Sequence, residues 1–193
     1  MHDFWLCFVP LFVAVDALGV FPFFMALTEE LDRPRIRRII WQSLVTGMVV
    51  AVIFVVIGKA VFRLLGITPY DFMVAGGTLL FALSLRDLLL TQKPHETVDP
   101  ESLGAVPIGV PLIVGPAVLT TIIILVDTHG VAPTTLAAIL NILIAGVVFW
   151  FSPFIARILG KAGSKAVSKL ASLLLAAIAV MMVRKGVQHL LMP

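Results

Sequence analysis

The chain has 193 residues, of which 60% are hydrophobic and only 13% are charged. A soluble domain carries about 25% charged residues, and its core is too small to bury this much apolar surface. We therefore expect an integral membrane protein, with no nucleic-acid partner despite its formal net charge of +3. One cysteine and four scattered histidines exclude an intramolecular disulfide and give no zinc-ligand spacing, so we expect no metal site.

Six apolar segments follow one another along the chain, most of them near the length of about 20 residues that spans a bilayer. They are Phe4–Leu27, Ile39–Val61, Phe72–Leu90, Gly104–Val126, Thr134–Ile155 and Lys165–Leu191. The first is too long for a secretory signal peptide and lacks a basic flank before it. We expect it to be the first membrane span.

Basic residues are distributed unevenly between the connecting loops. Ten of the 14 lysines and arginines fall in or beside the first, third and fifth loops: Arg33, Arg35, Arg37, Arg38, Arg86, Lys93, Arg157, Lys161, Lys165 and Lys169. Positively charged loops stay in the cytoplasm. We therefore expect both termini outside. Trp150 lies deeper within the fifth segment, and we expect it to pack inside the bundle.

A polar stretch, residues 91–104, divides the chain into halves at residues 1–90 and 105–193. Three spans in each half would place the halves in opposite orientations, as in transporters with inverted repeats. Two echoes support a repeat: VPLFV at Val9–Val13 resembles VPLIV at Val110–Val114, and the short apolar runs Phe72–Leu85 and Leu170–Val183 each stop at an arginine, Arg86 or Arg184. Coincidence is the alternative. The predicted fold is an all-α polytopic membrane protein of six transmembrane helices, arranged as two inverted three-helix repeats.

Glycine and proline interrupt the first segment of each half, in DALGVFP at residues 16–22 and PIGVPLIVGPA at residues 107–117. Proline removes a backbone donor, and a helix broken within the membrane is tolerated only where the freed groups face protein or water. Paired interruptions of this kind indicate a transport site. A proline kink with close helix packing and no ligand is the alternative. The predicted substrate-binding residues are Asp16, Gly19, Pro22, Gly115, Pro116, Thr120 and Thr121.

Each candidate has a functional and a structural interpretation. An unpaired carboxylate such as Asp16 is costly within a membrane, so it should be protonated, paired or hydrated. It would bind a substrate ammonium, carry a proton or coordinate sodium, or else cap the freed amides of its own helix. Thr120 and Thr121 would line the same cavity, or bond back to their own helix. Gly76 and Gly77 are expected to let another helix approach closely.

Three stretches resemble the MarC family of bacterial inner-membrane proteins, also described as small neutral amino acid transporters. DALGVFPFFxALT begins at Asp16, AGGTLLFAL at Ala75 and VPLIVGPAVLTT at Val110. They are similar to the family's first-, third- and fourth-helix patterns. The family usually has proline where this chain has Ala17 and glycine where it has Ala117, so both breaks should be slightly less severe.

The resemblance implies a secondary transporter of glycine- or alanine-like amino acids in the bacterial inner membrane, working by alternating access with Na⁺ or H⁺ as the coupling ion and with no other cofactor. The alternative is an exporter or flippase of a larger amphiphile, such as a drug or lipid. ATP coupling within the chain is disfavoured, because it has no nucleotide-binding loop. An intramembrane enzyme is disfavoured, because neither an aspartyl-protease motif pair nor a serine–histidine arrangement is present. Expected partners are the substrate and membrane lipids. A homodimer is a further hypothesis, with Gly76, Gly77 or Gly146 at the contact.

Overall fold

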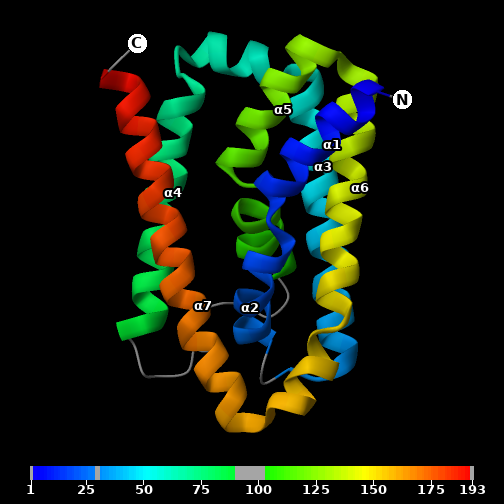
Figure 1. The fold of residues 1–193 in the computed structure, drawn as a ribbon, viewed down its shortest axis with the longest axis vertical. Coiled ribbons are helices and arrows are strands. Elements are labelled where there is room, and N and C mark those ends of the chain that lie inside the picture. Colours follow the sequence, from blue (N-terminus) through cyan, green and yellow to red (C-terminus); the bar gives the residue numbers. More distant parts are fainter. Residues whose placement is uncertain (1, 29–30, 90–102, 192–193) are drawn as a thin grey trace.

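A computed structural model describes residues 2–28, 31–89 and 103–191. Every regular element in these ranges is a helix. The helices form an elongated bundle in which the chain passes back and forth along one axis, and α1 begins at the same end of the bundle at which α7 finishes (Figure 1). The predicted connecting loop, residues 91–104, lies outside the described ranges except for its last two residues.

The first half of the chain is a broken helix followed by two continuous ones: α1 His2–Val15, α2 Ala17–Thr28, α3 Arg33–Leu65 and α4 Pro69–Leu89. Gly66 ends α3 in the left-handed conformation (φ 65°), which glycine adopts at little cost. Thr68 and Asp71 then cap α4 reciprocally: the Thr68 N–H donates to the Asp71 carboxylate at 2.7 Å, and the Asp71 N–H donates to the Thr68 hydroxyl at 3.2 Å.

The second half of the chain contains η2 Gly104–Ile113, α5 Pro116–His129, α6 Val131–Trp150 and α7 Ser152–Leu191. Helix η2 has the wide turns of a π-helix, and residues Val106 and Val110 within it are extended (φ −135°). Gly130 separates α5 from α6, and α7 changes direction at Gly160, where φ is 62°. The start of α7 lies at the end of the bundle opposite the two termini (Figure 1).

Four helical stretches are long and apolar enough to cross a membrane: His2–Thr28, Arg33–Leu65, Val131–Ile155 and Ser172–Leu191. Helices η2 and α5, bent by 56° at their junction, make a fifth candidate if counted as one span. The apolar part of α4, Pro69–Leu85, is shorter than these. The described residues therefore support a multi-pass, all-helical membrane protein with four or five candidate spans, and the sixth span stays a prediction.

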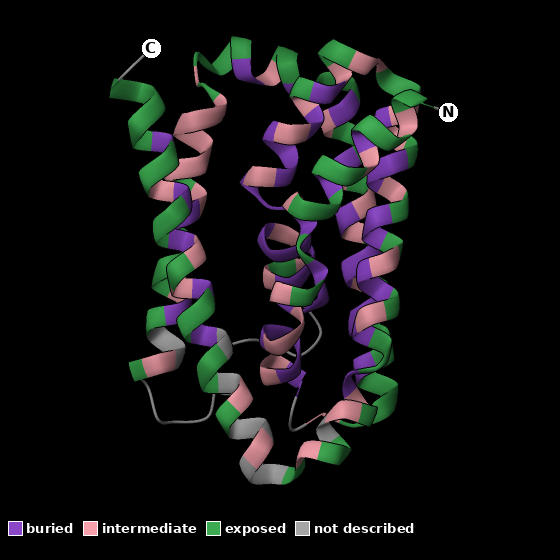
Figure 2. Ribbon diagram, viewed as in Figure 1, coloured by how far each residue is buried: buried purple, intermediate pink, exposed green. Residues whose placement is uncertain are grey.

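Buried residues lie where the helices face one another, and exposed residues cover the outside (Figure 2). Helices α4 and α7 pack along each other, while α3 packs on η2 and α6, and α1 on α6. At the core, the fully buried rings of Phe24 and Phe149 stack in parallel with centroids 4.4 Å apart. Many outward side chains are large and apolar, such as Val13 and Val56, which is the surface that lipid requires.

Two glycines of α4 lie at its close contacts. A Cβ added at Gly77 would stand 2.8 Å from the carbonyl oxygen of Ala179 on α7. A Cβ at Gly76 would overlap the ring of Pro116, the first residue of α5. Small residues here let the backbones approach closely, as in other membrane helix pairs.

Candidate functional site

Asp16 is the residue at which the first span breaks. It has φ 43°, and it is the one non-glycine residue with positive φ in the described part of the chain. Aspartate is among the few side chains that tolerate this conformation. Its N–H still donates to the Phe12 carbonyl at 3.2 Å, and its carbonyl accepts from the Val20 N–H at 2.9 Å. The break is therefore confined to one residue, around which α1 and α2 change direction.

The Asp16 side chain caps the helix that follows it. Its Oδ1 accepts a hydrogen bond from the Gly19 N–H at 3.1 Å, which satisfies one of the free donors in the first turn of α2. A side chain at Gly19 would overlap this carboxylate, because an added Cβ would stand 2.7 Å from its carboxyl carbon. Gly19 therefore provides the space in which the Asp16 carboxylate lies.

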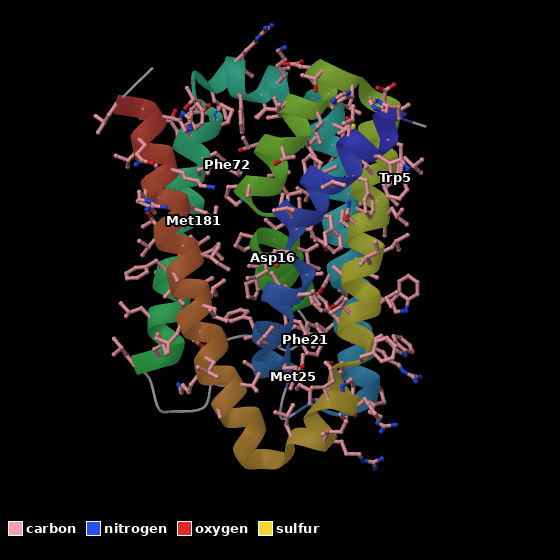
Figure 3. All side chains as sticks on the ribbon, in the orientation of Figure 1. Trp5, Asp16, Phe21, Met25, Phe72 and Met181 are labelled. Atoms are coloured by element: carbon pink, nitrogen blue, oxygen red, sulfur yellow. The ribbon has the colours of Figure 1, made fainter. Side chains whose placement is uncertain are left out.

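The Asp16 carboxylate is also exposed, and no basic side chain pairs with it among the described residues. Figure 3 places Asp16 about half-way along the bundle. An unpaired carboxylate at that depth is unfavourable in hydrocarbon by several kcal/mol, so it requires water, a cation or a partner group. The Asp16 side chain thus caps α2 and still has exposed carboxylate surface that is open to a ligand.

The second break lies between η2 and α5. The chain leaves its helical conformation at Val114 (φ −109°, ψ 75°) and Gly115 (φ −91°, ψ 179°), and Pro116 then begins α5. A Cβ on Gly115 would overlap the Pro111 carbonyl oxygen, so the turn is too tight for another residue. Proline suits the first helical position, because its missing N–H would have had no partner there.

No side chain caps the N-terminus of α5 among the described residues. The N–H groups of its first turn point out of the helix and carry the positive end of its dipole. One turn on, Thr120 is 8% exposed and its hydroxyl has no hydrogen-bond partner among the described residues. The hydroxyl of Thr121 instead donates to the Ala117 carbonyl at 2.7 Å, bonding back to its own helix.

Both breaks lie near mid-height of the bundle, and α2 and α5 run away from them towards opposite ends (Figure 1). Two helix N-termini therefore begin in the same layer. One carries the carboxylate of Asp16, and the other is open. Beyond the breaks, α1 packs on α5 and α2 contacts η2.

The remaining candidate, Pro22, lies within the continuous helix α2 rather than at the break. Proline at this position leaves the Leu18 carbonyl without its usual intrahelical donor. The opening of the chain is thus due to the left-handed Asp16, which the glycine and proline spacing did not indicate.

One cavity of about 410 Å³ lies away from both breaks, at the end of the bundle where α3 begins. Trp150 borders it and is 48% exposed, so the expectation that Trp150 packs inside the bundle was wrong. Its position five residues before the predicted end of the fifth span suggested depth, but α6 ends at Trp150 itself. No group of three or more metal-ligating side chains occurs in the described ranges.

Comparison with known proteins decides the family. The model of the MarC family of integral membrane proteins matches residues 1–191. The chain belongs to the MarC family. The resemblance expected from the three sequence stretches is confirmed, and with it the multi-pass membrane character.

Named relatives of this MarC protein occur in archaea and bacteria. It is 32% identical to UPF0056 membrane protein MJ0972 of Methanocaldococcus jannaschii, over 93% of this chain and 84% of the relative. It is 31% identical to a UPF0056 membrane protein of Aquifex aeolicus, over 99% and 97% of the two chains. UPF0056 membrane protein YvbG of Bacillus subtilis is 26% identical over 94% and 92%. No solved structure matches the chain.

Proposed function

We propose that this MarC protein is a secondary transporter of small neutral amino acids, and that its substrate binds between the two helix breaks. The single observation that carries the proposal is that the exposed Asp16 carboxylate and the uncapped N-terminus of α5 lie at a similar height in the bundle. Both lie at mid-height, where ordinary spans leave no polar groups free.

The chemistry of these two groups matches the two ends of an amino acid zwitterion. The substrate ammonium would bind the Asp16 carboxylate beside its bond to Gly19. The substrate carboxylate would accept hydrogen bonds from the first turn of α5, where the helix dipole favours an anion. Thr120 would supply a further donor, since its buried hydroxyl has no partner among the described residues. Thr121 would not, because its hydroxyl is already bonded.

Close packing around Gly19 and at the second break limits the size of the substrate's side chain. Pro116 presses on Gly76, and the Asp16 carboxylate fills the space over Gly19. Neighbouring residues of the second break, from Pro111 to Pro116, are all buried. A side chain as small as that of glycine or alanine is therefore the best fit, and this restriction adds to the family resemblance.

The inverted repeat forms part of the same proposal and is supported by matched helix contacts. Helix α1 packs on α6 as η2 packs on α3, and α2 packs on α7 as α5 packs on α4. Two further pairs, α3 with α6 and α4 with α7, each join equivalent helices of the two halves. Alternating access would then be a rocking of one half against the other about the mid-height site.

The proposed orientation follows from the basic residues. The arginine-rich start of α3 and the start of α7 share the end opposite both termini (Figure 1). The positive-inside rule places that end in the cytoplasm and both termini outside. Coupling to H⁺ or Na⁺ would use the same carboxylate, Asp16.

The test is uptake of radiolabelled glycine and alanine into proteoliposomes, with imposed proton or sodium gradients. The wild type should accumulate label under one gradient, and Asp16→Asn should lose this while keeping the fold, because asparagine can still cap α2. Asp127→Asn is the matched control, since Asp127 lies on α5 and pairs with Lys59 at 2.7 Å, away from the breaks. Equal uptake by wild type and Asp16→Asn would refute the site.

A second function, export or flipping of an amphiphile, is favoured by one observation. Val9, Phe12, Val13 and Asp16 have the spacing of one helix face, and all four are exposed. A polar group opening sideways to lipid suits a substrate with a charged head and an apolar tail. Dithionite quenching of a fluorescent phospholipid in the same proteoliposomes distinguishes the two: Asp16-dependent flipping without amino acid uptake would favour the second function.

A further inference from the structure

The cavity at the start of α3 combines positive charge with aromatic surface. It lies between α3 and the corner where α6 passes into α7, two regions that run side by side in Figure 1. Its volume is about 410 Å³. The residues that line it are Arg33, Ile36, Arg37, Ile40, Trp150, Phe151, Pro153, Phe154 and Arg157.

Three guanidinium groups converge on this cavity from two helices, and no carboxylate lies among the described residues that line it. Arg33 and Arg37 come from the first two turns of α3, and Arg157 from the first turns of α7. Within the described ranges, none of the three forms an ion pair; the ion pair at this end of α3 joins Arg35 to Asp32 instead. Three like charges repel, so the arrangement is best stabilised by a multivalent anion.

The geometry of these groups suits phosphate. The Arg37 guanidinium lies over the Trp150 ring, 4.8 Å from its centroid. This stacking fixes the plane in which the guanidinium N–H donors lie. Arginine matches the oxygens of phosphate in a bidentate manner. Helix α3 also begins at Arg33 without a side-chain cap, so its positive end faces the same region.

The other wall of the cavity is apolar and open. Trp150, Phe151 and Phe154 are all about half exposed or more, although each is a large aromatic residue. Free inorganic phosphate would gain nothing from this wall. A phospholipid would gain from it, because its glycerol and acyl chains would lie against the apolar wall while its phosphate lies at the arginines. Aromatic and arginine residues together are also typical of the membrane–water interface.

We propose that this cavity binds the phosphate of an anionic phospholipid, held by Arg33, Arg37 and Arg157 and bordered by Trp150. The site is independent of the proposed transport site, because it shares no residue with the two helix breaks. Basic pockets between spans on the cytoplasmic side are suited to such headgroups. A bound lipid would join the α6–α7 corner to α3 and so link the two halves of the bundle.

Native mass spectrometry of the purified full-length protein in detergent tests the proposal, with phosphatidylglycerol and phosphatidylcholine titrated separately. The wild type should retain one phosphatidylglycerol molecule at concentrations where phosphatidylcholine is lost. Arg37→Gln and Arg157→Gln should each weaken its retention about tenfold, as expected for one lost charge-assisted hydrogen bond. Because the two variants change different helices, a folding defect in one of them would not explain the same loss in both.

Arg63→Gln is the matched control, because Arg63 is an exposed arginine of α3 at the opposite end of the helix. It should retain phosphatidylglycerol as the wild type does. Equal weakening in all three variants, or none in any, would overturn the proposal. Displacement of the lipid by an equal concentration of inorganic phosphate would also overturn it, since free phosphate would then be the occupant.

Discussion

Substitution of Gly19 by alanine should displace the Asp16 carboxylate with little net change in the stability of the protein. An added Cβ would stand 2.7 Å from the Asp16 carboxyl carbon and 3.0 Å from its Oδ1, so the carboxylate must turn away. The Oδ1 bond to the Gly19 N–H, 3.1 Å long, is then lost. Among the described residues, Asp16 is the one unpaired acid at mid-height of the bundle. We expect Gly19→Ala to move its carboxylate while leaving the rest of the fold intact.

The two energetic effects of this change nearly cancel. Loss of a helix cap costs about 1 kcal/mol. Replacement of a helical glycine by alanine restores about 0.5–1 kcal/mol through the smaller entropy of the unfolded chain. The net change in the free energy of unfolding should therefore be below about 1 kcal/mol, although amino acid uptake should fall at least tenfold.

Two measurements on the same preparation check this expectation: unfolding in sodium dodecyl sulfate followed by circular dichroism, and uptake in proteoliposomes. Gly58→Ala is the control, because an added Cβ there meets mainly the movable ring of Phe54 at 3.0 Å. Asp16→Ala should abolish uptake and also lose the cap, whereas Asp16→Asn should abolish uptake alone. Normal uptake by Gly19→Ala would refute the argument that the position of the carboxylate matters.

Three further predictions concern other parts of the bundle. Gly77→Ala should destabilise the protein by about 1–3 kcal/mol in the same unfolding assay, because the added Cβ meets α7 backbone at 2.8 Å, while Leu79→Ala on the lipid-facing side should change little. Thr120→Val should reduce uptake without loss of stability, and Thr121→Val should not reduce it, since that hydroxyl bonds to its own helix; equal uptake by both would remove Thr120 from the site. Phe149→Ala should destabilise by about 3–5 kcal/mol, because its ring is fully buried against another phenylalanine; a loss below about 1 kcal/mol would show that the stacked pair contributes little.

The sequence indicated the helical class and the two interrupted segments, because glycine and proline act locally and lipid demands long apolar runs. It located the second break well: Gly115 and Pro116 lie at the turn itself. It located the first less well, since Pro22 lies inside a continuous helix and the turn is at Asp16. A left-handed aspartate has no distinctive neighbours in the sequence, so its conformation follows from tertiary packing rather than from local propensity.

Features that depend on which helices meet could not be predicted. Thr120 and Thr121 are adjacent and chemically identical, yet only one lacks a partner, because their side chains point about 100° apart around α5. The same reason explains Trp150. Its depth depended on where α6 ends, and its neighbours include Arg37 of α3, which lies more than 100 residues away in the chain.

The proposed site depends most directly on water reaching Asp16 at mid-height. Cys7, the single cysteine, is buried, so a Cys7→Ser background allows Asp16→Cys to be labelled alone in proteoliposomes. A membrane-impermeant methanethiosulfonate reagent should modify the introduced thiol from the water phase. Modification by a lipid-soluble maleimide alone, with no reaction from the water phase, would mean that Asp16 faces lipid and would contradict the proposed transport site.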